Sequence, residues 1–60
     1  MERIHNSTVR KDIERHLEIY SWMELVNSCR RNLADLIRYP EENKWQIKYY
    51  EKYWKLLNEY

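Results

Sequence analysis

Apolar side chains recur at steps of four and three through the first half of the chain, which is the period of an α-helix with one buried face. The first stripe consists of Val9, Ile13, His16, Leu17, Tyr20 and Met23. A second stripe with the same steps consists of Trp22, Val26, Cys29, Leu33 and Leu36. The second stripe begins before the first has ended, so the two lie on different faces of the predicted helix.

The offset between the two stripes has two explanations, because a regular heptad repeat drifts by only about 20° per heptad. The helix breaks or kinks near Ser21 or near Asn27 and Ser28, or it runs straight and shows different faces to two neighbours. Neither glycine nor proline occurs in this stretch, and such residues are the usual cause of a break. We therefore favour one continuous helix over residues 8–38.

Pro40 is the single proline of the chain, which contains no glycine at all. Proline disfavours helical geometry in the residue before it and is accepted in the first turn of a new helix. The pattern predicts a turn over residues 39–41 and a second helix over residues 42–59. Residues 1–6 show no period and are expected to form a flexible arm. The predicted fold is a single all-α domain with the shape of a helical hairpin.

The two predicted helices differ in length, at roughly 45 Å and roughly 27 Å. An antiparallel second helix therefore covers only the C-terminal half of the first and leaves the first stripe uncovered. Exposed apolar surface of this extent usually marks an interface. We expect two such overhangs to pack together as a homodimeric four-helix arrangement. The predicted self-association residues are Val9, Ile13, His16, Leu17 and Tyr20.

The aromatic residues are six Tyr and three Trp, with no Phe. These side chains combine a large apolar body with a polar tip and are enriched at binding hot spots. On the second predicted helix the apolar side chains spread over roughly 200°, more than one buried face requires. The surplus arc of Ile47, Tyr50 and Trp54 has the spacing of a helix-in-groove contact. We predict that it binds a protein partner; the alternatives are a place in the dimer core or a half-exposed surface.

The basic residues support a second interpretation. Lys44, Lys48 and Lys52 recur every four residues on the opposite face of the second helix, and Arg30 and Arg31 lie on the first. A row of lysines beside aromatic rings can contact phosphates while bases stack on the rings, so these five residues are candidate nucleic-acid contacts. The competing explanation is a solvated helix face, because glutamates are interspersed and the formal net charge is only +1.

Neither catalysis nor metal binding is indicated by the residues present. A structural zinc site needs four ligands in paired spacing, whereas His5, His16 and Cys29 are scattered along the chain. Cys29 belongs to the second apolar stripe and is expected to be a small buried side chain. We therefore expect a protein that is not an enzyme and that uses no cofactor or metal.

The composition also bears on location. No apolar run approaches the roughly 18 residues of a membrane span, so membrane insertion is not expected. The N-terminal residues lack the apolar segment of a signal peptide. Together with a single cysteine, these features favour the cytoplasm, or the host cytoplasm for a phage protein.

Residues 7–43, STVRKDIERHLEIYSWMELVNSCRRNLADLIRYPEEN, resemble the N-terminal helical part of small phage-encoded activators of late-gene transcription. The likeness consists of a helix of the type IE..L..Y, an apolar stretch that bears arginines, and a proline. It implies a binding module or a regulator of transcription. Those activators continue into a helix-turn-helix DNA reader, for which the 60 residues hold no counterpart. No functional residue is carried over.

The leading hypothesis is a small dimeric regulator or inhibitor that binds another protein through a Tyr/Trp-rich helical surface. One alternative is a nucleic-acid-binding regulator that uses the Lys/Arg face. Another is a structural subunit of a larger helical assembly.

Overall fold

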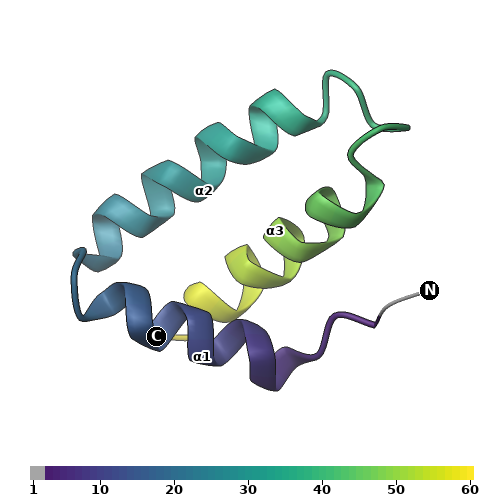
Figure 1. Ribbon diagram of the computed structural model, residues 1–60. Helices are drawn as coiled ribbons and strands as arrows, with labels where there is room; N and C mark the ends of the chain where they lie inside the picture. Colours follow the sequence, from purple (N-terminus) through teal and green to yellow (C-terminus); the bar gives the residue numbers. More distant parts are fainter. Residues whose placement is uncertain (1–2) are drawn as a thin grey trace.

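The computed structural model describes residues 3–60, which form three α-helices joined by turns (Figure 1). The helices are α1 (Asn6–Leu17), α2 (Trp22–Leu36) and α3 (Lys44–Leu57), and no strand occurs among the described residues. The all-α class is confirmed. The two-helix hairpin is wrong, because residues 8–38 contain two helices instead of one.

A capping box at Ser21 separates α1 from α2. The Ser21 hydroxyl accepts a hydrogen bond from the Glu24 amide at 3.2 Å, and the Glu24 carboxylate accepts one from the Ser21 amide at 3.1 Å. This reciprocal pair satisfies two amides that the start of a helix leaves without partners. The extended backbone of Ser21, with φ −74° and ψ 160°, turns the chain before α2 begins. The predicted continuous helix is therefore wrong, because local capping outweighs the absence of glycine and proline.

The core lies where α1 and α2 both pack against α3, while α1 and α2 contact each other much less. Its buried residues are Val9, Ile13, Leu25, Val26, Cys29, Tyr53, Leu56 and Leu57. All three helices contribute to this one cluster. A chain of this size is marginal in buried area, so the contribution of α1 is essential to the core.

The predicted overhang does not exist, because the turn at Ser21 folds α1 back onto α3. Val9 and Ile13, which were expected to form a self-association surface, are 0% exposed within the single chain. His16 and Leu17 are half-buried, and only Tyr20 of the five predicted residues is exposed. Val9 and Ile13, two residues of the surface on which the four-helix dimer was predicted, thus belong to the core of the single chain.

The second connection is longer than the predicted turn at residues 39–41, because α2 ends at Leu36 and α3 begins at Lys44. The Asn43 side chain donates a hydrogen bond to the Leu36 carbonyl at 3.2 Å, so the two ends of the connection are joined directly. The break near Pro40 is confirmed. The second helix is shorter than the expected residues 42–59.

At the N-terminus α1 begins at Asn6, within the segment expected to be a flexible arm. Ile4 is partly buried against the core, and its carbonyl accepts a hydrogen bond from the Lys52 ammonium. Residues 3–5, called the N-terminal segment below, therefore lie against α3. Residues 1 and 2 of the predicted arm lie outside the described residues.

Candidate functional site

The predicted partner-binding arc is not a free surface. Ile47, Tyr50 and Trp54 are half-buried, and Tyr50 and Trp54 pack against the core. The Tyr50 carbonyl also accepts a hydrogen bond from the Cys29 thiol at 3.5 Å. Tyr50 therefore joins α3 to α2, and the burial of all three side chains corresponds to the half-exposed alternative in the sequence interpretation.

Aromatic rings form a ladder along α3. Trp45 stacks on Tyr49 with ring centroids 5.7 Å apart and an angle of 15° between the rings. Tyr50 meets Tyr49 edge to face at 5.3 Å, and Tyr53 lies 6.0 Å from Tyr49. These separations are typical of favourable aromatic pairs. The ladder gives α3 a rigid apolar face with hydroxyl groups along its edge.

Two hydroxyls of this ladder bind polar side chains of α1. The Tyr49 hydroxyl donates to the Asp12 carboxylate at 2.6 Å, and the Tyr53 hydroxyl is hydrogen-bonded to His16 Nδ1 at 2.9 Å. Burial raises the pKa of Tyr53 to about 12. Burial, followed by the hydrogen bond to Asp12, raises the pKa of Tyr49 as well. Both phenols are therefore neutral at physiological pH and hold α1 in place on α3.

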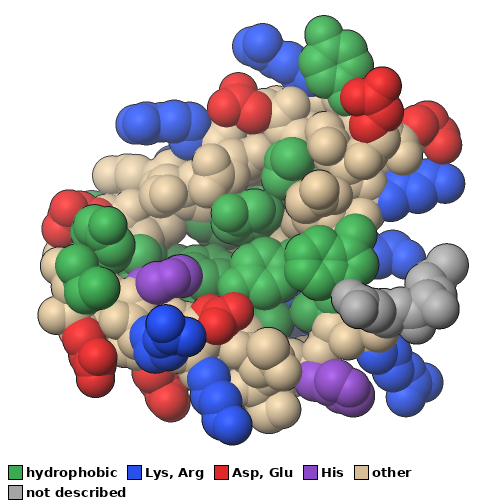
Figure 2. Space-filling view, viewed as in Figure 1, with side chains coloured by type: hydrophobic (Ala, Val, Ile, Leu, Met, Phe, Trp, Pro, Cys, Tyr) green, Lys and Arg blue, Asp and Glu red, His purple; other side chains and the backbone are tan. Residues whose placement is uncertain are grey.

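A pocket of about 430 Å³ opens beside the ladder and is called the tyrosine pocket below. Its residues come from all three helices and include Tyr49, Tyr50, Tyr53, Leu25, Cys29 and His16. The exposed side chains of Tyr20 and Glu24 also line it. Figure 2 shows apolar side chains gathered along the middle of the molecule, between α2 above and α1 below. The pocket therefore offers an apolar interior with polar groups around it.

A group of exposed apolar side chains surrounds the turn between α1 and α2. Ile19 is 74% exposed, Met23 59% and Tyr20 49%. Trp22 is more covered, and its indole N–H donates to the Leu57 carbonyl at 2.9 Å, which satisfies a carbonyl at the end of α3. We call Ile19, Tyr20, Trp22 and Met23 the joint patch. Tyr20 also lines the tyrosine pocket, so the patch and the pocket share this residue.

Sequence reasoning assigned Tyr20 to self-association and did not identify the joint patch as a surface. The available signal is the sequence IYSWM, in which apolar residues lie on both sides of Ser21. Together with Glu24, Ser21 forms the S-x-x-E signature of a helix start. Apolar residues on both sides of such a signature lie at a turn, where only some of them can face the core.

The five predicted nucleic-acid contacts do not share one hollow. Lys48 and Lys52 line a hollow beside the N-terminal segment, whereas Arg30, Arg31 and Lys44 do not. Lys44 forms an exposed ion pair with Glu41 at 3.3 Å. Lys48 and Lys52 therefore share one hollow, and the other three predicted contacts lie outside it.

Cys29 provides the single thiol of the chain. Cys29 is buried, and burial raises the pKa of its thiol to about 11, which leaves it protonated and weakly nucleophilic. Within residues 3–60, no three His, Cys, Asp or Glu side chains gather closely enough to hold a metal ion. None of the helices in this part of the chain has the length and apolar character of a membrane span.

Comparisons with protein families, curated proteins and solved structures find no significant match to this chain. The resemblance of residues 7–43 to late-gene activators therefore stays a prediction. The functional argument rests on the joint patch, the tyrosine pocket and the charged surface.

Proposed function

We propose that this chain is a small non-enzymatic regulatory protein that binds another protein through the joint patch and the tyrosine pocket. The observation that carries the proposal is that Tyr20 belongs to both, which places an exposed aromatic side chain of the patch at a pocket of about 430 Å³. Single exposed apolar residues are ordinary, whereas a cluster beside a concave site is typical of an interface. Tyrosines with available edges are also common at such sites.

The lining of the pocket indicates what it accepts from the partner. Leu25 and the rings of Tyr49 and Tyr53 provide an apolar wall, while His16 and Glu24 provide polar groups. A volume of this size holds a large side chain such as Leu, Phe or Trp. The partner then inserts an apolar anchor into the pocket and covers Ile19 and Met23 with the surface around that anchor, so that water is excluded from the contact.

A second copy of the chain is the competing occupant. The surface predicted for the homodimer includes Val9 and Ile13. These two residues cannot contact a second copy, because both are buried within one chain. A standard stable interface buries about 800 Å² on each partner, and the joint patch offers four side chains. We therefore favour a foreign protein with its own complementary anchor, and a monomeric free chain.

The test compares two pairs of surface substitutions. Ile19→Ser with Met23→Ser alters the joint patch, where both side chains are exposed and their removal leaves the core intact. The matched control is Ile37→Ser with Tyr39→Ser, because these side chains are 59% and 64% exposed but lie at the other turn. Circular dichroism melts verify that both variants fold like the original chain.

Partners are first identified by capture on the immobilised chain, and their affinity is then measured by titration calorimetry. We expect the joint-patch variant to weaken binding at least tenfold and the control to change it less than twofold. Equal loss in both variants would mean that binding depends on general hydrophobicity. A partner whose affinity is unchanged by the joint-patch substitutions would contradict the proposed surface.

A further inference from the structure

A second and larger hollow, of about 850 Å³, lies between the N-terminal segment and α3. Arg3, His5 and Asn6 line one side, and Lys48, Lys52 and Lys55 line the other. We call it the basic groove. It brings together cationic side chains that are more than forty residues apart in sequence, which a helix-face pattern alone does not reveal.

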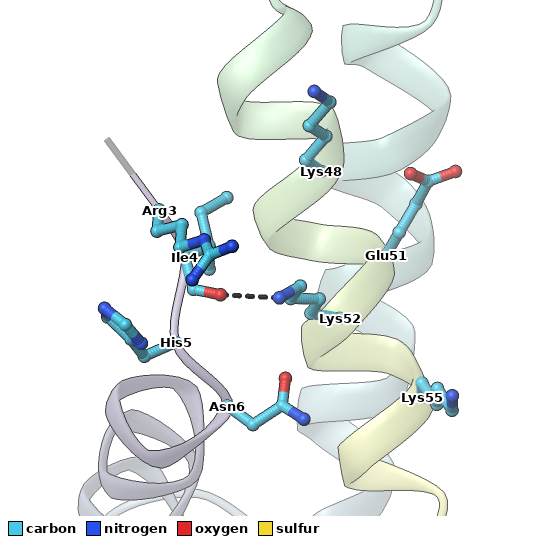
Figure 3. A pocket seen from close by; sticks show the side chains of 8 residues that line it. All are labelled: Arg3, Ile4, His5, Asn6, Lys48, Glu51, Lys52 and Lys55. Carbon is cyan, nitrogen blue, oxygen red and sulfur yellow. Dashed lines mark hydrogen bonds between the residues drawn. The ribbon is translucent and has the colours of Figure 1, made fainter. Parts of the chain in front are cut away.

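The side chains of the basic groove differ in direction (Figure 3). Arg3 extends from the N-terminal segment toward α3, and Lys52 extends from α3 toward the N-terminal segment, so their charged ends converge. The Asn6 amide points into the same gap, while Glu51 and Lys55 point to the other side of α3. The inner part of the groove therefore presents the donors of Arg3 and Lys52 beside the Asn6 amide, and no carboxylate drawn in this view lies between them.

Lys52 holds the groove together. Its ammonium donates to the Ile4 carbonyl at 2.5 Å, which ties the N-terminal segment to α3. A lysine ammonium has three N–H donors, so two remain for another acceptor. The side chain is half-buried, and a partly desolvated cation gains most from an anion placed beside it.

Within residues 3–60, few carboxylates accompany the positive charges of the groove. Among the described residues the ion pairs are Arg10 with Glu59 and Lys44 with Glu41, and neither includes a lining residue of the groove. Glu51 and Lys55 have the i, i+4 spacing of a favourable pair, yet they form no ion pair. One glutamate thus accompanies four Lys and Arg side chains of the lining, whereas the whole chain carries a formal net charge of only +1.

The shape of the groove favours an extended anion. A smaller hollow of about 340 Å³ shares Asn6, Lys52 and Lys55 with it, so the concave surface continues along α1 and α3. It adds Arg10 and Glu59, which form an ion pair, so the excess of positive charge stays in the larger groove. No tyrosine or tryptophan lines either hollow, which removes base stacking as a source of affinity. Contacts to a row of phosphates are then the remaining source of affinity for a nucleic acid. We propose that the basic groove binds the phosphodiester backbone of a nucleic acid, without reading its sequence.

The groove is separate from the joint patch. Arg3 precedes the start of α1, whereas Ile19 follows its end (Figure 1), and a helix of 12 residues is roughly 18 Å long. Nucleic-acid binding therefore does not depend on the proposed protein partner. An experiment can contradict one of the two proposals and leave the other intact.

The test compares two variants, each of which removes two positive charges from a different part of the surface. Arg3→Gln with Lys48→Gln alters the groove and keeps the Lys52 contact to Ile4. The matched control is Arg30→Gln with Arg31→Gln, which removes two exposed positive charges from α2. These are two of the five nucleic-acid contacts that the sequence pattern predicts. Both variants have the same formal net charge, so a difference between them reports position.

Binding is measured by fluorescence anisotropy with labelled single- and double-stranded oligonucleotides of mixed sequence over a series of NaCl concentrations. We expect the groove variant to lose about tenfold in affinity at low salt. The slope of log K against log salt should fall by roughly 1.4–1.8, since each of two lost phosphate contacts contributes roughly 0.7–0.9. The control should retain its slope. Equal losses in both variants, or no binding by the original chain at low salt, would overturn the proposal.

Other anions serve as competitors. Inorganic tripolyphosphate should compete weakly, because it offers only a short row of phosphates. Stronger binding of a poly-glutamate peptide, or of vesicles that contain anionic phospholipid, than of the oligonucleotides would also overturn the proposal. Tight binding of tripolyphosphate alone would assign the groove to a small phosphate ligand and would contradict the extended one.

Discussion

Tyr49 on α3 donates its hydroxyl hydrogen to the carboxylate of Asp12 on α1, across a distance of 2.6 Å. One helical turn further along both helices, Tyr53 and His16 repeat the arrangement at 2.9 Å. The two contacts set the position of α1 along α3, and apolar packing of Val9 and Ile13 provides most of the burial beside them. These two hydrogen bonds fix α1 at one position on α3, which apolar packing alone would not do.

We expect Tyr49→Phe to lower the free energy of unfolding by roughly 1–2 kcal/mol, because it removes a hydrogen bond to a charged acceptor in a half-buried site. The measurement is urea denaturation followed by circular dichroism. Asp12→Asn and the double variant complete a cycle, in which we expect a coupling of about 1 kcal/mol. Additive effects of the two substitutions would show that the contact adds nothing beyond the packing of the ring.

The all-α class and the break near Pro40 could be predicted from sequence, because helical period and proline geometry act locally. The break at Ser21 is also local and readable from Ser21 and Glu24, but the prediction of a continuous helix rests on the absence of glycine and proline and does not consider this cap. The predicted overhang at Val9 and Ile13 depends on the same continuous helix. A long helix leaves these residues beyond the reach of α3, whereas a bent chain brings them into the core.

The candidate sites were harder to predict, because they depend on how separate segments meet. Lys48 and Lys52 were recognised as a row, but Arg3 joins them only because Ile4 packs against the core. Tyr20 was recognised as apolar and exposed, but its place beside the tyrosine pocket depends on the turn at Ser21. Such juxtapositions are not encoded in the spacing of residues within one helix.

The capping box predicts how far a substitution of Ser21 lowers the free energy of unfolding. Ser21→Ala removes the hydroxyl that accepts the Glu24 amide, and we expect the free energy of unfolding to fall by about 1 kcal/mol. Ser7→Ala is the matched control, because Ser7 is exposed within α1 and forms no capping hydrogen bond. Chemical denaturation of both variants provides the comparison. A loss in Ser7→Ala as large as that in Ser21→Ala would contradict the role of the cap.

High pH should destabilise the fold through its buried phenols. Burial raises the pKa of Tyr53 to about 12, from an ordinary value of about 10 in an unfolded chain. Between these values the unfolded chain has released the proton that the folded chain still holds, so stability falls as pH rises. The contribution is complete below pH of about 10 and is lost as the pH rises through about 12.

Tyr53→Phe should therefore show a shallower loss of stability between pH of about 10 and 12, although its stability at neutral pH is lower. The free energy of unfolding is measured by urea denaturation at each pH for this variant and for the original chain. Tyr39→Phe, which removes a hydroxyl from an exposed ring, controls for the general effect of the substitution. Parallel pH profiles for Tyr53→Phe and the original chain would refute this account.

The buried position of Ile13 makes a prediction that separates the monomeric core from the dimer expected by the sequence pattern. Ile13 is fully buried within one chain, so Ile13→Ala should lower the free energy of unfolding by about 2–5 kcal/mol. Because this burial needs no second copy, the melting temperature of the original chain should not depend on protein concentration. Light scattering over a concentration series should give the mass of one chain.

Ile19→Ala supplies the comparison for Ile13→Ala, since both remove the same atoms and Ile19 is largely exposed on the joint patch. We expect its stability to change by less than about 0.5 kcal/mol. If instead the melting temperature rises with concentration and Ile19→Ala abolishes that rise, the joint patch binds a second copy of the chain. That result would preserve the fold and replace the foreign partner by self-association, through a surface other than Val9 and Ile13.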